Sequence, residues 1–70
     1  MRDAIVIERA GANVAAPVPD LPGCVATGGS IGDVEEQIRA AIACHVQGLR
    51  EDGVAVPLPS SQVEHVDVAA

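Results

Sequence analysis

The chain has 70 residues, with 10 acidic side chains against four arginines and no lysine, and its formal net charge at pH 7 is −6. A chain of this length forms one small domain with a modest core, and the absence of Phe, Tyr and Trp removes the side chains that usually supply the largest buried areas. The acidic charge repels phosphate backbones, and no aromatic ring is available for base stacking, so we expect no direct binding of nucleic acid.

The sequence also indicates where the protein is located and whether it assembles. The N-terminus, Met1-Arg2-Asp3-Ala4, lacks the apolar stretch of a signal peptide, and no apolar run reaches the roughly 20 residues of a membrane span. Two cysteines do not make a disulfide framework, so we expect a cytoplasmic protein that does not bind membranes. Because a single core of this size contributes only about 3–5 kcal/mol net, we also expect a homo-oligomer, at least a dimer.

Three short strands are predicted in the first half of the chain. Residues 4–9 are a β-branched run, and residues 14–18 alternate in the manner of a half-buried strand. Pro17 cannot donate to a ladder, which predicts an exposed edge near the end of that second strand. Residues 19–23 combine two prolines, an Asp and a Gly, a composition typical of a rigid connection, and residues 24–27 form the third strand.

One amphipathic helix is predicted over about residues 31–52, with Ser30 as its N-cap and Gly53 as its stop. Its apolar positions recur at steps of three and four, at Ile31, Val34, Ile38, Ala41, Ile42, His45 and Leu49. The proline-containing residues 54–61 read as a linker, and residues 62–68 as a fourth strand of uncertain register. The predicted fold is a single α+β domain over residues 1–70, an antiparallel β-β-β-α-β sheet covered by one helix on one face.

A family resemblance follows from these motifs in their order. Val18 to Cys24 reads Val-Pro-Asp-Leu-Pro-Gly-Cys, and after it come a short strand to Gly28, a Ser-capped helix from Ser30 to Ile42 and a Gly-terminated end at Gly53. In this combination the chain resembles the HicB-type antitoxin family over nearly its whole length. The resemblance implies a partial RNase H-like (HicB-like) fold without RNase activity, oligomerisation, and occlusion of a HicA-type toxin, which is a small basic ribonuclease that cleaves mRNA. No helix-turn-helix or ribbon-helix-helix domain follows, so we expect a short HicB-like domain without the DNA-binding domain that many members carry.

The leading functional interpretation is therefore an antitoxin-like inhibitor and not an enzyme, with no cofactor. An acidic surface attracts a basic protein and speeds its docking. The expected partner-binding residues are the rigid loop and the acidic helix positions: Asp20, Leu21, Pro22, Glu35, Glu36, Glu51 and Asp52. The alternative is an orphan HicB-like oligomerisation domain, structural or regulatory, with no toxin.

Other candidate chemistry has simpler explanations. A remote alternative is a relict two-metal nuclease, whose acids would be Asp3, Glu8, Asp20 and Asp67. A zinc site from Cys24, Cys44, His45 and His65 lacks the paired spacing of structural sites, and small apolar roles for the cysteines and a core or subunit-contact role for His45 are favoured. Residues 28–32 precede a helix as a phosphate cradle does, but they lack a P-loop Lys, and a capped strand-to-helix turn explains them.

Overall fold

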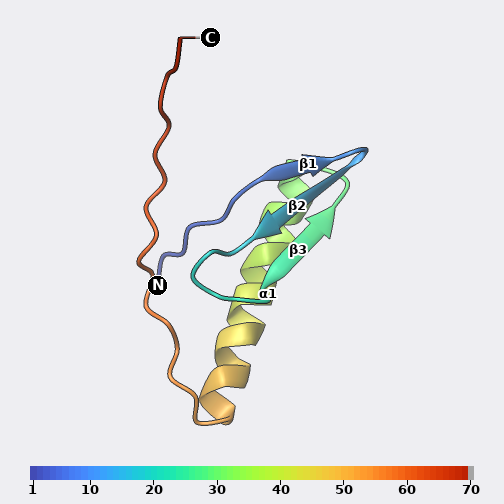
Figure 1. Cartoon of the computed structure of the whole chain (residues 1–70). Coiled ribbons are helices and arrows are strands. Elements are labelled where there is room, and N and C mark those ends of the chain that lie inside the picture. The colour runs from blue at the N-terminus through green and yellow to red at the C-terminus, as the bar shows by residue number, and fades with distance from the viewer. Residues whose placement is uncertain (70) are drawn as a thin grey trace.

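The computed structural model describes residues 1–69 and has an α+β architecture; Ala70, which the predicted domain includes, lies outside the described residues. The elements are β1 (Glu8–Ala10), β2 (Asn13–Pro17), β3 (Val25–Gly28) and α1 (Ile31–Glu51). The strands form one antiparallel sheet in the order β1-β2-β3, and α1 lies across one face of it (Figure 1). The predicted class, an antiparallel sheet with one helix on one face, is confirmed.

The first strand is shorter than predicted, and Pro17 provides the reason. In the register of β1 and β2, Glu8 lies opposite Ala15, and two residues before Glu8 the Val6 N–H donates to the Pro17 carbonyl at 3.1 Å. Paired residues of this kind normally exchange two bonds, but Pro17 has no N–H to return. The ladder is therefore regular only from Glu8, and residues 4–7 run alongside without forming a strand. β2 itself is the central strand and not an edge strand, and it tolerates Pro17 because this is its last residue.

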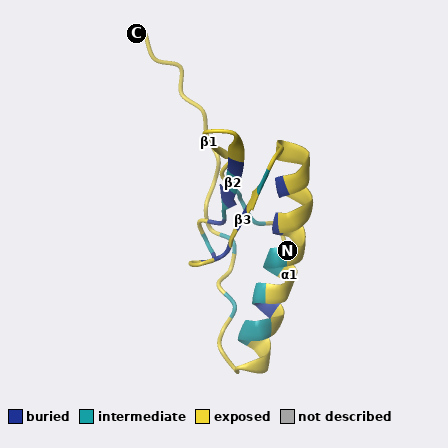
Figure 2. Ribbon diagram, turned by 90° about the vertical axis from the view of Figure 1, so that its right-hand side faces the viewer, coloured by how far each residue is buried: buried dark blue, intermediate teal, exposed yellow. Residues whose placement is uncertain are grey.

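The core lies between the sheet and α1, as the buried positions in Figure 2 show. Alternate residues of β2, Val14 and Ala16, face the helix, whereas Ala15 and Pro17 between them are only half-buried. The buried residues are Val14, Ala16, Val18, Leu21, Cys24, Ala26, Val34, Ile38 and Val46. Gly28 lets β3 approach the helix closely, because a Cβ there would lie 3.2 Å from the Val34 side chain. Burial of each large aliphatic side chain contributes about 1.5–3 kcal/mol, so a few residues carry most of this small core.

Both helix ends carry the predicted caps. The Ser30 hydroxyl accepts a hydrogen bond from the Asp33 N–H at 3.1 Å, which satisfies one of the orphan amides of the first turn. At the other end Gly53 adopts a φ of +70°, which a residue with a side chain rarely adopts, and the Val54 N–H reaches back to the Leu49 carbonyl at 2.8 Å. The helix is thus closed by local interactions on both sides.

The predicted fourth strand is wrong for the described chain. Residues 62–68 pair with no strand within residues 1–69, and the segment leads away from the sheet as an extended chain (Figure 1). A strand needs an adjacent edge with free backbone groups, and this segment diverges from every edge of its own sheet. The radius of gyration of 13.7 Å exceeds the roughly 11 Å of a compact chain of this length, which reflects the protruding end.

Candidate functional site

The loop between β2 and β3 is held by its own backbone, as the prolines predict. The Val18 N–H donates to the Cys24 carbonyl at 3.0 Å, and two further bonds link Leu21 to Val18 and Cys24 to Leu21. The Leu21 side chain is fully buried beneath the loop, whereas Pro22 is exposed at its tip. The loop is consequently a rigid projection whose shape depends on a core residue.

Asp20 in this loop receives four hydrogen bonds from the C-terminal segment. Its Oδ2 accepts from the backbone N–H groups of Ser60 and Ser61, both at 3.0 Å. Its Oδ1 accepts from the hydroxyls of the same serines, at 3.1 Å and 2.8 Å. These donors, the Ser61 backbone N–H first, lower the pKa of Asp20 from its ordinary value because they favour the charged carboxylate. We call this arrangement of Asp20, Ser60 and Ser61 the clasp.

Two residues expected to contact a partner, Asp20 and Leu21, make their contacts within the chain instead. Both carboxylate oxygens of Asp20 are engaged within the chain, and Leu21 has no exposed surface. Sequence reasoning missed the clasp because 40 residues separate Asp20 from Ser60. The only signal was the Ser-Ser pair that ends the proline-containing linker.

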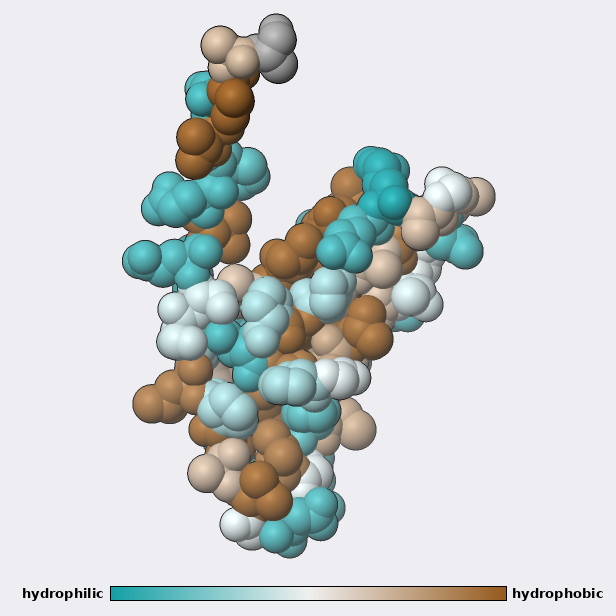
Figure 3. Space-filling view, viewed as in Figure 1, coloured by the Kyte–Doolittle hydropathy of each residue, from teal (hydrophilic) through white to brown (hydrophobic). Residues whose placement is uncertain are grey.

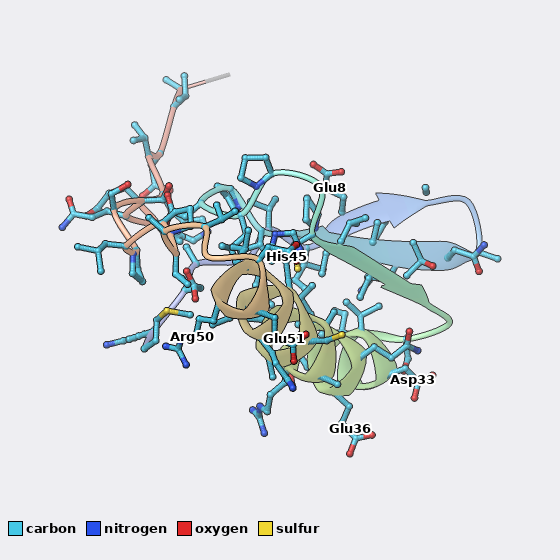
Figure 4. All side chains as sticks on the ribbon, turned by 90° about the horizontal axis from the view of Figure 1, so that it is seen from below. Glu8, Asp33, Glu36, His45, Arg50 and Glu51 are labelled. Atoms are coloured by element: carbon cyan, nitrogen blue, oxygen red, sulfur yellow. The ribbon has the colours of Figure 1, made fainter. Side chains whose placement is uncertain are left out.

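The four helix acids are exposed but do not form one cluster. Glu35 faces the N-terminal segment, whereas Glu36, one position further, points away from the sheet beside Asp33 (Figure 4). Glu51 and Asp52 lie at the far end of α1, about 22 Å from Glu36 along the helix axis. The Glu51 carboxylate accepts a hydrogen bond from Gln47 at 3.1 Å. The acids are therefore spread along α1 and point in different directions instead of forming a single patch.

A groove of about 380 Å³ separates the N-terminal segment from the first half of α1. Its lining is Met1, Asp3, Ile5, Glu35, Ile38, Arg39 and Ile42. The Oδ1 atom of Asp3 is buried there without a hydrogen-bond partner, and the charge of Asp3 is a secondary cause, after burial, of the raised pKa of the Cys24 thiol. Sequence reasoning placed Asp3 only among possible nuclease acids and did not predict this groove.

The outer face of the sheet carries a row of apolar residues that α1 does not cover. Val6 pairs with Pro17, and Pro17 pairs with Val25, so the three lie side by side across the strands. Val6 and Val25 are 41% and 53% exposed. Figure 3 shows brown apolar side chains over the sheet and again along the C-terminal segment.

The residues considered for metal chemistry are scattered. Cys24 is buried and Cys44 is exposed, and His45 lies on the side of α1 that faces the sheet, while Glu8 belongs to β1 of the sheet (Figure 4). Asp20 is engaged in the clasp, and His65 and Asp67 lie in the extended C-terminal segment. Across residues 1–69, no three His, Cys, Asp or Glu side chains are grouped so that they could hold a metal ion. The Gly-rich turn before α1 serves the Ser30 cap.

Comparisons with known proteins define the class of this chain. A family model described as the HicB-like antitoxin of bacterial toxin–antitoxin systems matches residues 4–69. The chain is also 32% identical over 53 residues to an uncharacterized 14.9 kDa protein in the rep-hol intergenic region of Haemophilus phage HP1. That match covers 76% of this chain but only 40% of the phage protein. In the described residues, α1 is too polar to cross a membrane.

Because the family model covers nearly the whole chain, this protein belongs to the HicB-like antitoxin family, and the resemblance seen in the sequence is confirmed. That family consists of antitoxins of bacterial toxin–antitoxin systems.

Proposed function

We propose that this protein is an antitoxin that binds a small basic HicA-type toxin in the cytoplasm and covers its RNA-cleaving site. The observation that carries this proposal is the match to HicB-like antitoxins over residues 4–69. The protein would act by occlusion and not by catalysis, as a dimer or larger oligomer, without touching nucleic acid itself. The family relation also supports comparing its sheet and helix with a partial RNase H-like arrangement.

The net charge and its placement support a basic partner. With a formal charge of −6, the chain attracts a basic protein at long range, and such steering raises the association rate more than it lowers the dissociation rate. We assign the direct contacts to Pro22, Glu35, Glu36, Glu51 and Asp52, which are all exposed. Asp20 and Leu21 contribute by fixing the shape of the loop beneath Pro22.

Co-expression with the small open reading frame beside the gene tests the proposal. The neighbouring product alone should arrest growth, and co-expression with this chain should restore growth and yield a complex that co-purifies. An absence of toxicity and of any complex would instead support the orphan oligomerisation domain. Association should slow as the salt concentration rises, because screening weakens the steering.

A matched pair of charge reversals locates the contact surface. Glu36→Lys and Glu8→Lys change the net charge equally, but Glu36 on α1 points away from the sheet, whereas Glu8 belongs to β1 of the sheet (Figure 4). If the toxin docks on α1, Glu36→Lys should slow association by about tenfold more than Glu8→Lys does. A larger effect of Glu8→Lys would move the contact to the sheet and overturn the assignment of the helix acids.

A further inference from the structure

The last residues of the described chain form an arm that has no place in their own domain. Residues 62–69, which we call the arm, are exposed throughout, and Val66 and Val68 are 82% and 78% exposed. Eight extended residues reach about 26 Å. Three valines within this length, Val63, Val66 and Val68, give the arm the β-branched residues that are enriched in strands.

The start of the arm is fixed, and this distinguishes it from a loose chain end. The clasp holds Ser60 and Ser61 on the Asp20 carboxylate through four hydrogen bonds. From Ser61 of the clasp onward, residues 61–64 lie across an open cleft from Arg2, Asp3 and Ala4. The arm thus leaves the body beside the N-terminal end of the β1 segment, and then diverges from it (Figure 1).

The free edge of β1 matches the arm in length and character. Since Val6 and Glu8 direct their backbone groups toward β2, the alternation of an antiparallel pair leaves those of Ile5, Ile7 and Arg9 directed outward. This edge extends over about as many residues as the arm. The opposite edge, β3, has only four residues and offers only Val25 and Thr27 in the same way.

We infer that two copies of this chain exchange arms, so that each arm adds a strand to the β1 edge of the other copy. A second copy is the occupant that fits, because it presents the same free edge and receives an arm in return, which closes a two-fold interface. The exchange would cover Val6 and Ile7, which are 41% and 37% exposed in the single chain. It also provides the partner that residues 62–68 lack within their own domain. The inference rests on the proposed self-association and not on the identity of the toxin.

Sedimentation of full-length variants tests the exchange, with detection by refractive index because the chain has no aromatic residue. The double variant Val66→Asp, Val68→Asp alters the arm only, and Leu58→Asp is a control outside the arm, since Leu58 is 83% exposed and precedes the clasp. The wild type and Leu58→Asp should be dimers, and the double variant should dissociate with a dissociation constant raised tenfold or more, on the order expected for lost apolar burial. Unchanged circular dichroism at 222 nm would show that the helix is intact.

Three results would overturn the inference. A wild type that stays monomeric at high micromolar concentration would remove the proposed self-association itself. A double variant that remains as strongly dimeric as the wild type would leave self-association standing but exclude the arm from it. The acceptor edge is tested by mixing isotope-labelled and unlabelled wild-type chains: methyl contacts from Val66 or Val68 to Ile5 or Ile7 should cross between copies. Contacts confined to one copy would show that the arm folds back on its own sheet.

Discussion

The body of the molecule, residues 1–53, and its C-terminal segment, residues 54–69, both contain valines, but the body buries most of them and the segment leaves most of them exposed. In the body, Val14, Val18 and Val34 are at most 3% exposed, whereas Val66 and Val68 beyond the clasp are about four-fifths exposed. Residues 54–69 contribute only Val56 to the margin of the core, and polar bonds to Asp20 hold them in place. Hydrophobicity alone therefore does not decide burial; a residue is buried only where the fold supplies a surface opposite it.

The largest expected effect on stability comes from replacing a leucine by alanine in each of the two regions. Leu21→Ala empties a fully buried site and should lower the free energy of unfolding by about 2–5 kcal/mol, comparable with the whole net stability of a core this size. Leu58→Ala, at an 83% exposed site, should change it by less than about 0.5 kcal/mol. Thermal unfolding followed at 222 nm compares the two. Equal losses would show that the C-terminal segment is packed in solution and would end the distinction between the regions.

The body could be predicted from sequence because its signals are local. Ser30, Gly53 and the apolar spacing of residues 31–49 determine α1 through interactions within a few residues, and the observed helix ends within one residue of the prediction. The first strand was predicted too long because the missing donor of Pro17 acts on Val6 across a strand pair. The fourth strand was predicted from composition, but strand formation depends on an available edge.

The candidate site was less predictable for the same reason. The motif around Asp20 marked the loop correctly, but its local sequence contains nothing about the serines that engage the carboxylate. The helix acids were expected together as partner-binding positions, but Glu35 and Glu36 point in different directions. Contacts between distant residues set the first outcome, which the local sequence does not show. The second follows from helix geometry, because neighbouring residues of an α-helix are rotated by about 100°.

A smaller effect on the free energy of unfolding is expected at two serines, Ser30 at the start of α1 and Ser60 in the clasp. Ser30→Ala removes the N-cap of α1 and should lower the free energy of unfolding by about 1 kcal/mol, because an amide of the first turn loses its acceptor. Ser60→Ala removes one of the four hydrogen bonds of the clasp and should lower it by less than about 0.5 kcal/mol, since the segment it holds adds little to the core. Urea unfolding measured at 222 nm gives both values. If Ser60→Ala proved the more destabilising, the clasp would have to be counted as part of the folding unit.

The smallest expected effect on global stability is at Asp20, where a change should affect only the C-terminal segment. The pKa of Asp20 is lowered in the folded chain, so the clasp is fully formed above the ordinary value of 3.8. It loosens as the pH falls through the lowered pKa, because protonation removes the negative charge that the serine donors stabilise. Asp20→Asn should reproduce this loosening at pH 7. Backbone ¹⁵N relaxation should then show residues 60–69 becoming more mobile while α1 is unchanged, and Glu36→Gln, which removes an exposed charge outside the clasp, should leave them as in the wild type. If the mobility of residues 60–69 were the same in wild type and Asp20→Asn at pH 7, the clasp would not be what positions the C-terminal segment, and the body and the segment would be joined only through the linker after α1.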